Sequence, residues 1–243
     1  MENIFLIRSS DRTSNSTSST AFTLQLSNTI EGEYEIEYIN MYNTFYTVVT
    51  GFNDKLYWND GSTNHTTTVP PGIYSSSGSN SIATQMTAAS SASATITAAF
   101  DAYNQKLTIT STQNFSLKFG TNTTNSIAKT LGYTNADTTA ATIATATYLP
   151  SLSGPSSVNI RIAECDIVSW NNGLGQYGSV LLPMNVSANA LKEYTKDDFR
   201  QFVGFRTPVQ QLNISVFDTT GNALSLNGTD WELAMRKIRP RYN

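Results

Sequence analysis

LNISVFDTTGNALSLNGTDWELAMRKI, residues 212–238, is the stretch that best predicts the fold. Apolar and polar residues alternate at its start, as in a strand with one face on a core and the other in water. Residues 218–222 then combine Asp, Thr, Gly and Asn, which favour turns. A second strand at residues 231–238 begins with Trp231, and the two strands are predicted to form a closing hairpin. A chain that ends on a buried strand needs partner strands from much earlier in the sequence, which is typical of a β-sandwich or jelly roll.

The composition also favours a β protein. Charged residues make up 14% of the 243 residues, far below the usual quarter, and Ser, Thr and Asn take their place. Thr is favoured in half-buried strands and Ser in turns, while an aromatic content of 11% argues against disorder. The length suffices for one sandwich with an insertion.

The charge pattern gives little reason to expect a nucleic-acid partner. The net charge of −3 provides no general attraction to nucleic acid, and we expect no sequence-specific binding. Arg236, Lys237, Arg239 and Arg241 form a basic tip near the C-terminus. We interpret it first as a solvated or lattice-contacting tail and second as a contact with packaged nucleic acid.

Cysteine usage and hydropathy bear on the compartment. Cys165 is the one cysteine, so an intramolecular disulfide is impossible and no oxidising compartment is required. The apolar run at residues 4–7 is too short for a signal peptide, and no segment is as long as a membrane helix. We therefore expect a protein with no membrane span that is not secreted by the usual route.

The order of the patterns predicts three parts. Residues 1–20 are mostly polar after residue 8 and are expected to form an extended N-terminal arm. Strand patterns before about residue 70 and after about residue 155 are each too few for a closed sandwich, so residues 21–69 and 155–243 should share one jelly-roll domain. Residues 70–154 are then a small mixed α/β insertion domain. Its expected elements are a helix capped by Ser79 or Ser81, strands at 95–100, 106–110 and 114–119, and a helix at 125–131.

Two local features are expected inside the first strand group. A turn at Glu31–Gly32 leads into the longest strand pattern, in which Glu33, Glu35 and Glu37 mark the face in water. Further along, Asp60–Gly61 is a hairpin turn signal.

Residues able to support catalysis are sparse. His65 is the one histidine and would have to serve any Ser-His-Asp or Cys-His site, but it lies in a polar turn, and Cys165 is a hundred residues away. We interpret His65 as an exposed loop residue. Metal sites built on several His or Cys are excluded by count. Gly173 and Gly175 lack the further glycine and the helix of a dinucleotide-binding loop.

Two carboxylate pairs are the remaining candidates for chemistry. Asp197 with Asp198, and Glu164 with Asp166, could bind Ca²⁺ or act as glycosidase acids. If residues 164–166 form a strand, Glu164 and Asp166 point the same way. Acidic pairs in loops are usually just solvated, so we predict no enzyme, no catalytic or metal-binding residue and no cofactor.

Seven short motifs are spread over nearly the whole chain: IRSSDR (7–12), FTLQL (22–26), NTFY (43–46), VPPGIY (69–74), the segment 103–119, AKTLGY (128–133) and the ending 217–231. Together they resemble penton and minor capsid proteins of virophages, polinton-like viruses and related large DNA viruses. The Ser/Thr/Ala tracts at 75–93 and 135–147 depart from the family pattern. The resemblance implies a single jelly roll standing upright in a capsid, with five copies closing an icosahedral vertex and the insertion as an outward-facing upper domain.

The resemblance thus implies a structural virion protein, a penton subunit that forms a homopentamer at the five-fold vertices of a double-stranded DNA virus. It further implies contact with neighbouring major capsid protein capsomers through the N-terminal arm, and a candidate host receptor or glycan at the insertion domain. The protein would be made in the infected host cell. Two alternatives stay open: a minor cement protein beneath the shell, and a carbohydrate-binding jelly roll for host attachment. The latter would use Trp58, Tyr74 or Trp170 as sugar platforms.

Overall fold

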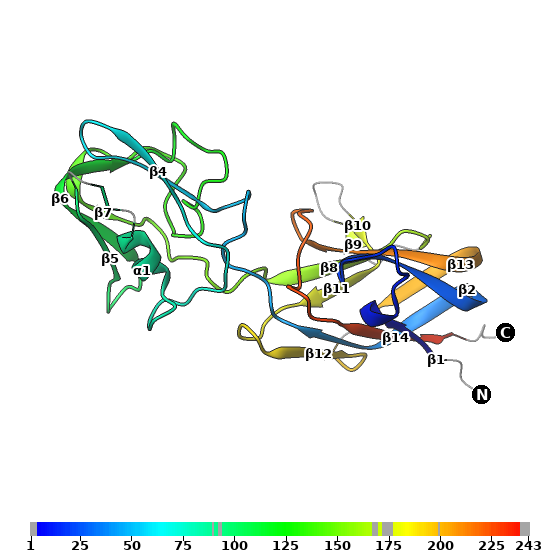
Figure 1. The fold of residues 1–243 in the computed structure, drawn as a ribbon. Helices are drawn as coiled ribbons and strands as arrows, with labels where there is room; N and C mark the ends of the chain where they lie inside the picture. Colours follow the sequence, from blue (N-terminus) through cyan, green and yellow to red (C-terminus); the bar gives the residue numbers. More distant parts are fainter. Residues whose placement is uncertain are drawn as a thin grey trace. The chain divides into compact units, whose positions relative to one another are not determined.

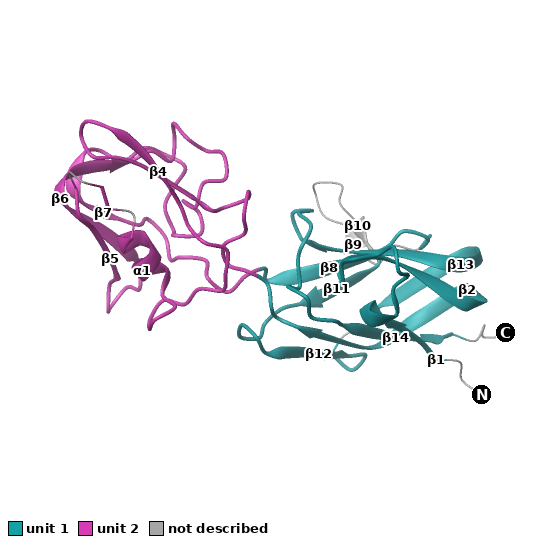
Figure 2. Ribbon diagram, viewed as in Figure 1, with its two compact units in different colours: residues 1–45, 155–243 teal, residues 46–154 magenta. Residues whose placement is uncertain are grey.

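The chain folds into two compact units, each with its own hydrophobic core (Figures 1 and 2). The computed structural model describes residues 4–88, 90–91, 94–166, 170–171, 177–198 and 200–238, with backbone only at 170–171 and 177–178. Unit 1 contains Met1–Phe45 and Pro155–Asn243, and unit 2 contains Tyr46–Gly154. The insertion therefore starts at Tyr46 and not at residue 70, because the strands near residues 55–68 pair within unit 2.

Unit 1 is built from antiparallel strands. They are β1 (Ile4–Arg8), β2 (Ala21–Tyr42), β8 (Ser157–Ile162), β11 (Val180–Pro183), β12 (Leu191–Thr195), β13 (Phe202–Asp218) and β14 (Glu232–Lys237), with the small pair β9 (Trp170–Asn171) and β10 (Tyr177–Gly178) beside them. The main sheet has the order β1-β14-β2-β13-β8-β11, and β12 also pairs with β2. This sheet curls around one core.

The strand order is that of a jelly roll. The second half of β2 pairs with β14 on one side and β12 on the other, whereas its first half pairs with β13. The two layers are therefore β1-β14-β2-β12 and β2-β13-β8-β11. If the two halves of β2 are counted as strands 2 and 3, then β8, β11, β12, β13 and β14 are strands 4 to 8. In these numbers the layers read 1-8-3-6 and 2-7-4-5. This is the double Greek-key order of an eight-stranded jelly roll, which confirms the predicted mainly β fold class.

The passage of β2 from one layer to the other occurs at a bend. Gly32 has φ +96° inside the strand, so the turn predicted at Glu31–Gly32 is a bend without chain reversal. Opposite this bend, the register of β13 shifts between Phe205 and Gln211. Pro208 lies within β13 in this irregular stretch. Bulges of this kind bend and twist a strand pair.

The last two long strands do not form the predicted hairpin. β13 pairs with β2 and β8, while β14 pairs with β1 and β2, so β2 lies between them. The prediction that the end of the chain pairs with its start is nevertheless confirmed. Trp231 is only 3% exposed. Its Nε1 donates to the Ser19 carbonyl at 2.7 Å, and its ring meets Phe22 edge-on at 5.9 Å.

Residues 4–20 do not form a separate extended arm. β1 pairs along its whole length with β14, and the short 3-10 turn Ser9–Asp11 follows. Ser9 is buried, and its amide donates to the Trp231 carbonyl at 3.0 Å. Arg12 pairs with Asp230, and the Thr13 amide donates to the Thr23 carbonyl. Residues 9–20 lack periodicity because hydrogen bonds, and not an apolar stripe, hold them to the sandwich.

A side chain closes the outer edge of β11. The Gln201 side chain accepts from the Leu181 amide at 2.7 Å and donates to the Leu181 carbonyl at 2.8 Å, as a neighbouring strand would. The Gln201 carbonyl in turn accepts from the Ile36 amide in β2. Gln201 therefore links the two layers and masks a sheet edge that would otherwise invite another chain.

Unit 2 contains α1 (Ile82–Thr87) and the strands β3 (Lys55–Asn59), β4 (Asn64–Thr68), β5 (Ile96–Phe100), β6 (Leu107–Leu117) and β7 (Ala141–Thr145). The Ser81 hydroxyl caps α1 as predicted, and β3 and β4 form the predicted hairpin. Two separate predictions, strands 106–110 and 114–119, correspond to the one long strand β6, which pairs with β5, β7 and β3.

The second predicted helix of the insertion is absent from this region. Residues 125–131 form turns, and Gly132 follows with φ +83°. A Cβ at Gly132 would lie 2.2 Å from the Tyr148 carbonyl oxygen, so the chain passes too close there for any other residue. Across the described ranges of both units, no helix has the length and apolar character needed to cross a membrane.

Candidate functional site

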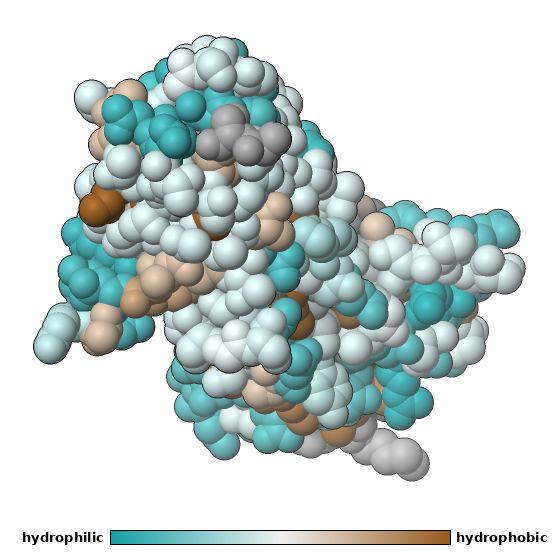
Figure 3. Space-filling model, turned by 60° about the vertical axis from the view of Figure 1, so that its left-hand side comes forward, coloured by the Kyte–Doolittle hydropathy of each residue, from teal (hydrophilic) through white to brown (hydrophobic). Residues whose placement is uncertain are grey.

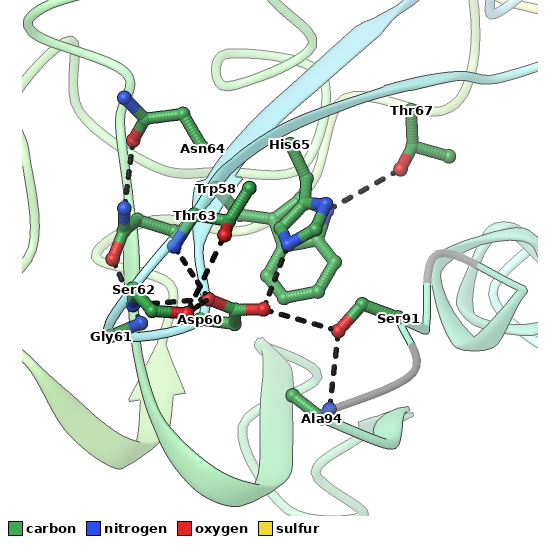
Figure 4. A network of polar contacts seen from close by, with 11 residues as sticks. Trp58, Asp60, Gly61, Ser62, Thr63, Asn64, His65, Thr67, Ser91 and Ala94 are labelled. Carbon is green, nitrogen blue, oxygen red and sulfur yellow. Dashed lines mark hydrogen bonds and ion pairs between the residues drawn. The ribbon is translucent and has the colours of Figure 1, made fainter.

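The densest polar cluster surrounds Asp60, in the turn between β3 and β4 (Figure 4). The carboxylate is buried. Its Oδ1 accepts from the Ser62 and Thr63 amides at 3.1 and 2.8 Å and from the Ser62 hydroxyl at 2.9 Å. Its Oδ2 lies 2.9 Å from His65 Nε2 and 3.3 Å from the Ser91 hydroxyl. Asp60 is thus held by contacts from both sides of the hairpin.

His65 is on a strand and not in an exposed loop as predicted. The tight turn places it directly opposite Trp58 in the β3–β4 register. The two rings stack with centroids 4.3 Å apart and an interplanar angle of 24°. The imidazole is therefore fixed on one face by Trp58 and at Nε2 by Asp60.

This cluster brings together a serine, an acid and a histidine in an order that does not suit nucleophilic catalysis. In a catalytic triad the histidine stands between the hydroxyl and the carboxylate, where it can remove the hydroxyl proton. Here the Asp60 carboxylate stands between Ser91 and His65 (Figure 4). The arrangement ties the hairpin to the segment after α1, and we interpret it as structural.

The acidic pair Glu164 and Asp166 also serves the backbone. Both oxygens of Glu164 accept from Asn213, from the amide at 2.8 Å and from Nδ2 at 2.7 Å. Asp166 Oδ2 accepts from the Arg206 amide at 2.7 Å. These residues lie in the turn after β8 and not in a strand, so the predicted common direction does not apply. Both glutamate and aspartate thus accept from backbone amides of β13: Arg206 lies in its irregular stretch, and Asn213 lies just after it.

The other sequence candidates are dispersed. Asp198 accepts from the Thr195 amide at 3.0 Å at the end of β12, and Asp197 beside it is exposed. Burial raises the pKa of the Cys165 thiol to about 11, which keeps it protonated and poorly nucleophilic. Gly173 and Gly175 lie outside the described residues. Within the described part of the chain, His, Cys, Asp and Glu form no group of three or more that could hold a metal.

The glutamate expected in water is instead clamped by arginines. Glu35 is 3% exposed and accepts from Arg200 Nε at 2.5 Å and from Arg236 Nη2 at 3.1 Å. The hydrogen bond from Arg200, with that from Arg236, holds the pKa of Glu35 below its usual value although burial opposes this. The cause is the strand register: Arg236 of β14 stands directly opposite Glu35 of β2, and with Arg200 it covers this carboxylate.

This ion-pair group also corrects the interpretation of the basic tip. Arg236 Nε lies 2.5 Å from Glu37 Oε1, so Arg236 is occupied by two acids of its own unit. Lys237 is exposed at the end of β14, and Arg239 and Arg241 lie outside the described residues.

The aromatic residues proposed as sugar platforms are mostly unsuitable. Trp58 and Tyr74 are buried in the core of unit 2, and the Tyr74 hydroxyl donates to the Pro70 carbonyl. The side chain of Trp170 lies outside the described structure. Among the residues whose side chains are described, the most exposed aromatic ones are Tyr42, Tyr46, Phe52, Tyr103, Tyr148 and Phe202. On the face shown in Figure 3, hydrophobic residues form small patches among neutral and hydrophilic ones.

No protein-family model and no curated protein sequence matches the chain. Among solved structures, the crystal structure of the selenomethionine-labelled mavirus penton protein is similar to it. The alignment covers 98% of this chain and 100% of that one, with 10% sequence identity and a TM-score of 0.46.

Proposed function

We propose that this chain is a structural capsid protein, a penton subunit whose homopentamer closes the five-fold vertices of an icosahedral double-stranded DNA virus. The observation that supports this most is the strand order of unit 1, an eight-stranded jelly roll with a separate compact unit inserted between β2 and β8. A jelly roll with an inserted unit is the architecture that the resemblance to penton and minor capsid proteins implies. The protein would accordingly be located at the vertex of the virion.

The surface chemistry suits self-assembly. A ring of five copies uses a heterologous contact, in which one patch meets a different patch of the next copy and the rotation closes the ring. Charged residues are only 14% of the chain, so repulsion between identical neighbours is low. Gln201 masks the β11 edge, which disfavours strand addition there as a competing mode of association.

Contact with neighbouring major capsid protein capsomers is part of this proposal, in a modified form. Because β1 is a strand of the sandwich and Ser9 and Ser19 contact Trp231, residues 4–20 are not available as a free tether. We propose instead that their exposed side chains, mainly in the polar stretch 10–18, meet the neighbouring capsomers while the backbone stays on unit 1.

Unit 2 is proposed to supply the contact with the host, a receptor or a glycan. Because unit 2 is a compact unit with its own core, its surface residues can change without loss of the jelly roll. With Trp58 and Tyr74 buried, such contact would have to use the exposed side chains of this unit.

The oligomer's mass tests the proposal. Native mass spectrometry of the purified protein should show five 26.5-kDa subunits, about 130 kDa in all. Cryo-electron microscopy of particles should then place the protein at the five-fold axis. A monomer or a trimer in solution, together with density beneath the shell, would contradict the penton assignment and favour a minor cement protein.

A further inference from the structure

A hollow on the outer surface of unit 1 belongs to none of the features described above. It has a volume of about 270 Å³. Its lining residues come from β1 and the 3-10 turn after it, from β2 and β12, and from the start of β14 with the two residues before it: Arg8, Ser10, Asn40, Tyr42, Leu191, Asp230, Trp231 and Glu232. All of them lie within one compact unit.

The strand register gives the hollow two unlike walls. Tyr42 of β2 stands directly opposite Leu191 of β12, and these two side chains form the apolar wall. On the other side, Arg8 of β1 stands opposite Glu232 of β14. Ser10 and Asp230 extend the polar wall past the ends of these strands.

The polar groups are held in place before any ligand arrives. Glu232 accepts from Asn40 Nδ2 at 3.1 Å and lies 3.6 Å from Arg8 Nε. Asp230 Oδ1 accepts from the Ser9 hydroxyl at 2.8 Å and from Arg12 at 2.9 Å. Groups fixed in this way bind without losing much further side-chain entropy.

The wall that a ligand would stack on is open to solvent. Tyr42 is 45% exposed, so its ring is accessible to a ligand. A second, larger hollow of about 520 Å³ on the β2-β13-β8 layer has Phe22 as its one aromatic lining residue, and Phe22 is buried. Of these two hollows, only the one at Tyr42 therefore combines an accessible aromatic ring with convergent polar groups.

We propose that this hollow binds a neutral sugar through a single pyranose ring. One face of a pyranose carries C–H groups, which suit the Tyr42 ring, and its hydroxyls both donate and accept, which suits carboxylate, amide and guanidinium groups across the hollow. The volume is below the roughly 300–1,000 Å³ of pockets for drug-sized ligands, so one ring is the expected fit. Asp230 pairs with Arg12 and Glu232 with Arg8, so these four groups offer no unpaired cation to an acidic sugar, and a neutral sugar is favoured.

This inference does not depend on the capsid assignment, since the site lies within the folded chain and can be probed on purified protein. It places sugar binding on the jelly roll itself, at a residue that the sequence patterns did not single out.

The test is a titration of the full-length protein with the methyl glycosides of glucose, galactose, mannose and N-acetylglucosamine, followed by ligand-observed NMR. At least one should bind saturably, and the methyl glycoside of sialic acid should bind more weakly. Tyr42→Ala should weaken binding about tenfold through loss of the stacking face, whereas Tyr42→Phe should retain it. Tyr103→Ala removes an aromatic ring that is 98% exposed in unit 2 and is the matched control, with unchanged binding.

Circular dichroism and the unfolding midpoint verify that each variant is folded. The proposal is overturned if none of the glycosides binds, or if Tyr42→Ala and Tyr103→Ala reduce binding equally. It is also overturned if Tyr42→Ala changes only the oligomer mass, because the hollow would then be a contact between protein chains.

Discussion

Replacing Trp231 with Ala should destabilise unit 1 selectively. The side chain is 3% exposed, packs edge-on against Phe22 and donates a 2.7 Å hydrogen bond to the Ser19 carbonyl. Removing a buried Trp costs about 3–5 kcal/mol in the free energy of unfolding. That is a large part of the roughly 5–15 kcal/mol available to a typical domain.

Trp231→Phe separates the two contributions. It keeps an aromatic ring against Phe22 but leaves the Ser19 carbonyl without its indole donor, which should cost about 1–3 kcal/mol. The Phe variant should therefore retain about half or more of the stability that the Ala variant loses.

Urea titration followed by hydrogen exchange and mass spectrometry resolves the two units. Peptides from β2 and β13 should lose protection in Trp231→Ala, while peptides from β6 in unit 2 should keep the wild-type midpoint, because the units have separate cores. A loss in unit 1 below about 1 kcal/mol, or an equal loss in unit 2, would refute this reasoning.

Three further outcomes are expected. Glu35→Gln should lower stability at neutral pH by about 1–2 kcal/mol, because it weakens two charge-assisted hydrogen bonds whose arginines are partly exposed and solvated. Since the pKa of Glu35 is lowered from 4.5 in the folded state, the wild type should lose this contribution as pH falls below that value, and urea midpoints of the variant should vary less there. Gln201→Ala removes two hydrogen bonds from the β11 backbone and should cost about 1–3 kcal/mol, measured as faster amide exchange in β11. Gly132→Ala should lower the unit 2 melting temperature strongly, whereas Gly78→Ala, at a similar φ but with nothing within 4 Å, should cost only about 1–2 kcal/mol; equal shifts would contradict the steric argument.

Local patterns in the sequence were sufficient for many elements but not for their partners. The alternation at residues 212–217 predicts a strand, and that stretch lies within β13. The alternation does not identify the neighbour of a strand. The sequence therefore predicts a hairpin of the last two strands, whereas β2 lies between β13 and β14 in the structure. Pairing depends on the curl of the whole sheet, which no short window of sequence contains.

Cross-strand partners explain the errors at single residues. Alternation predicts Glu35 in water, but Arg236 stands opposite it in the β14 register and Arg200 also reaches it, so the carboxylate is buried. Similarly, the Asp60 turn is visible in the sequence, but the stacking of His65 on Trp58 follows from the hairpin register. The hollow at Tyr42 is assembled from four strands and has no signature in any one of them.

Removing residues 46–154 tests most directly whether two distant parts of the chain form one jelly roll. The two ends of this insertion are near each other, since the Thr47 hydroxyl donates to the Leu152 carbonyl at 3.0 Å, so a short Gly-Ser linker should bridge the gap. The shortened protein should unfold cooperatively in urea, with amide protection in β2 and β13 like that of the intact chain. An unfolded product, or one without protection in β2, would contradict the account.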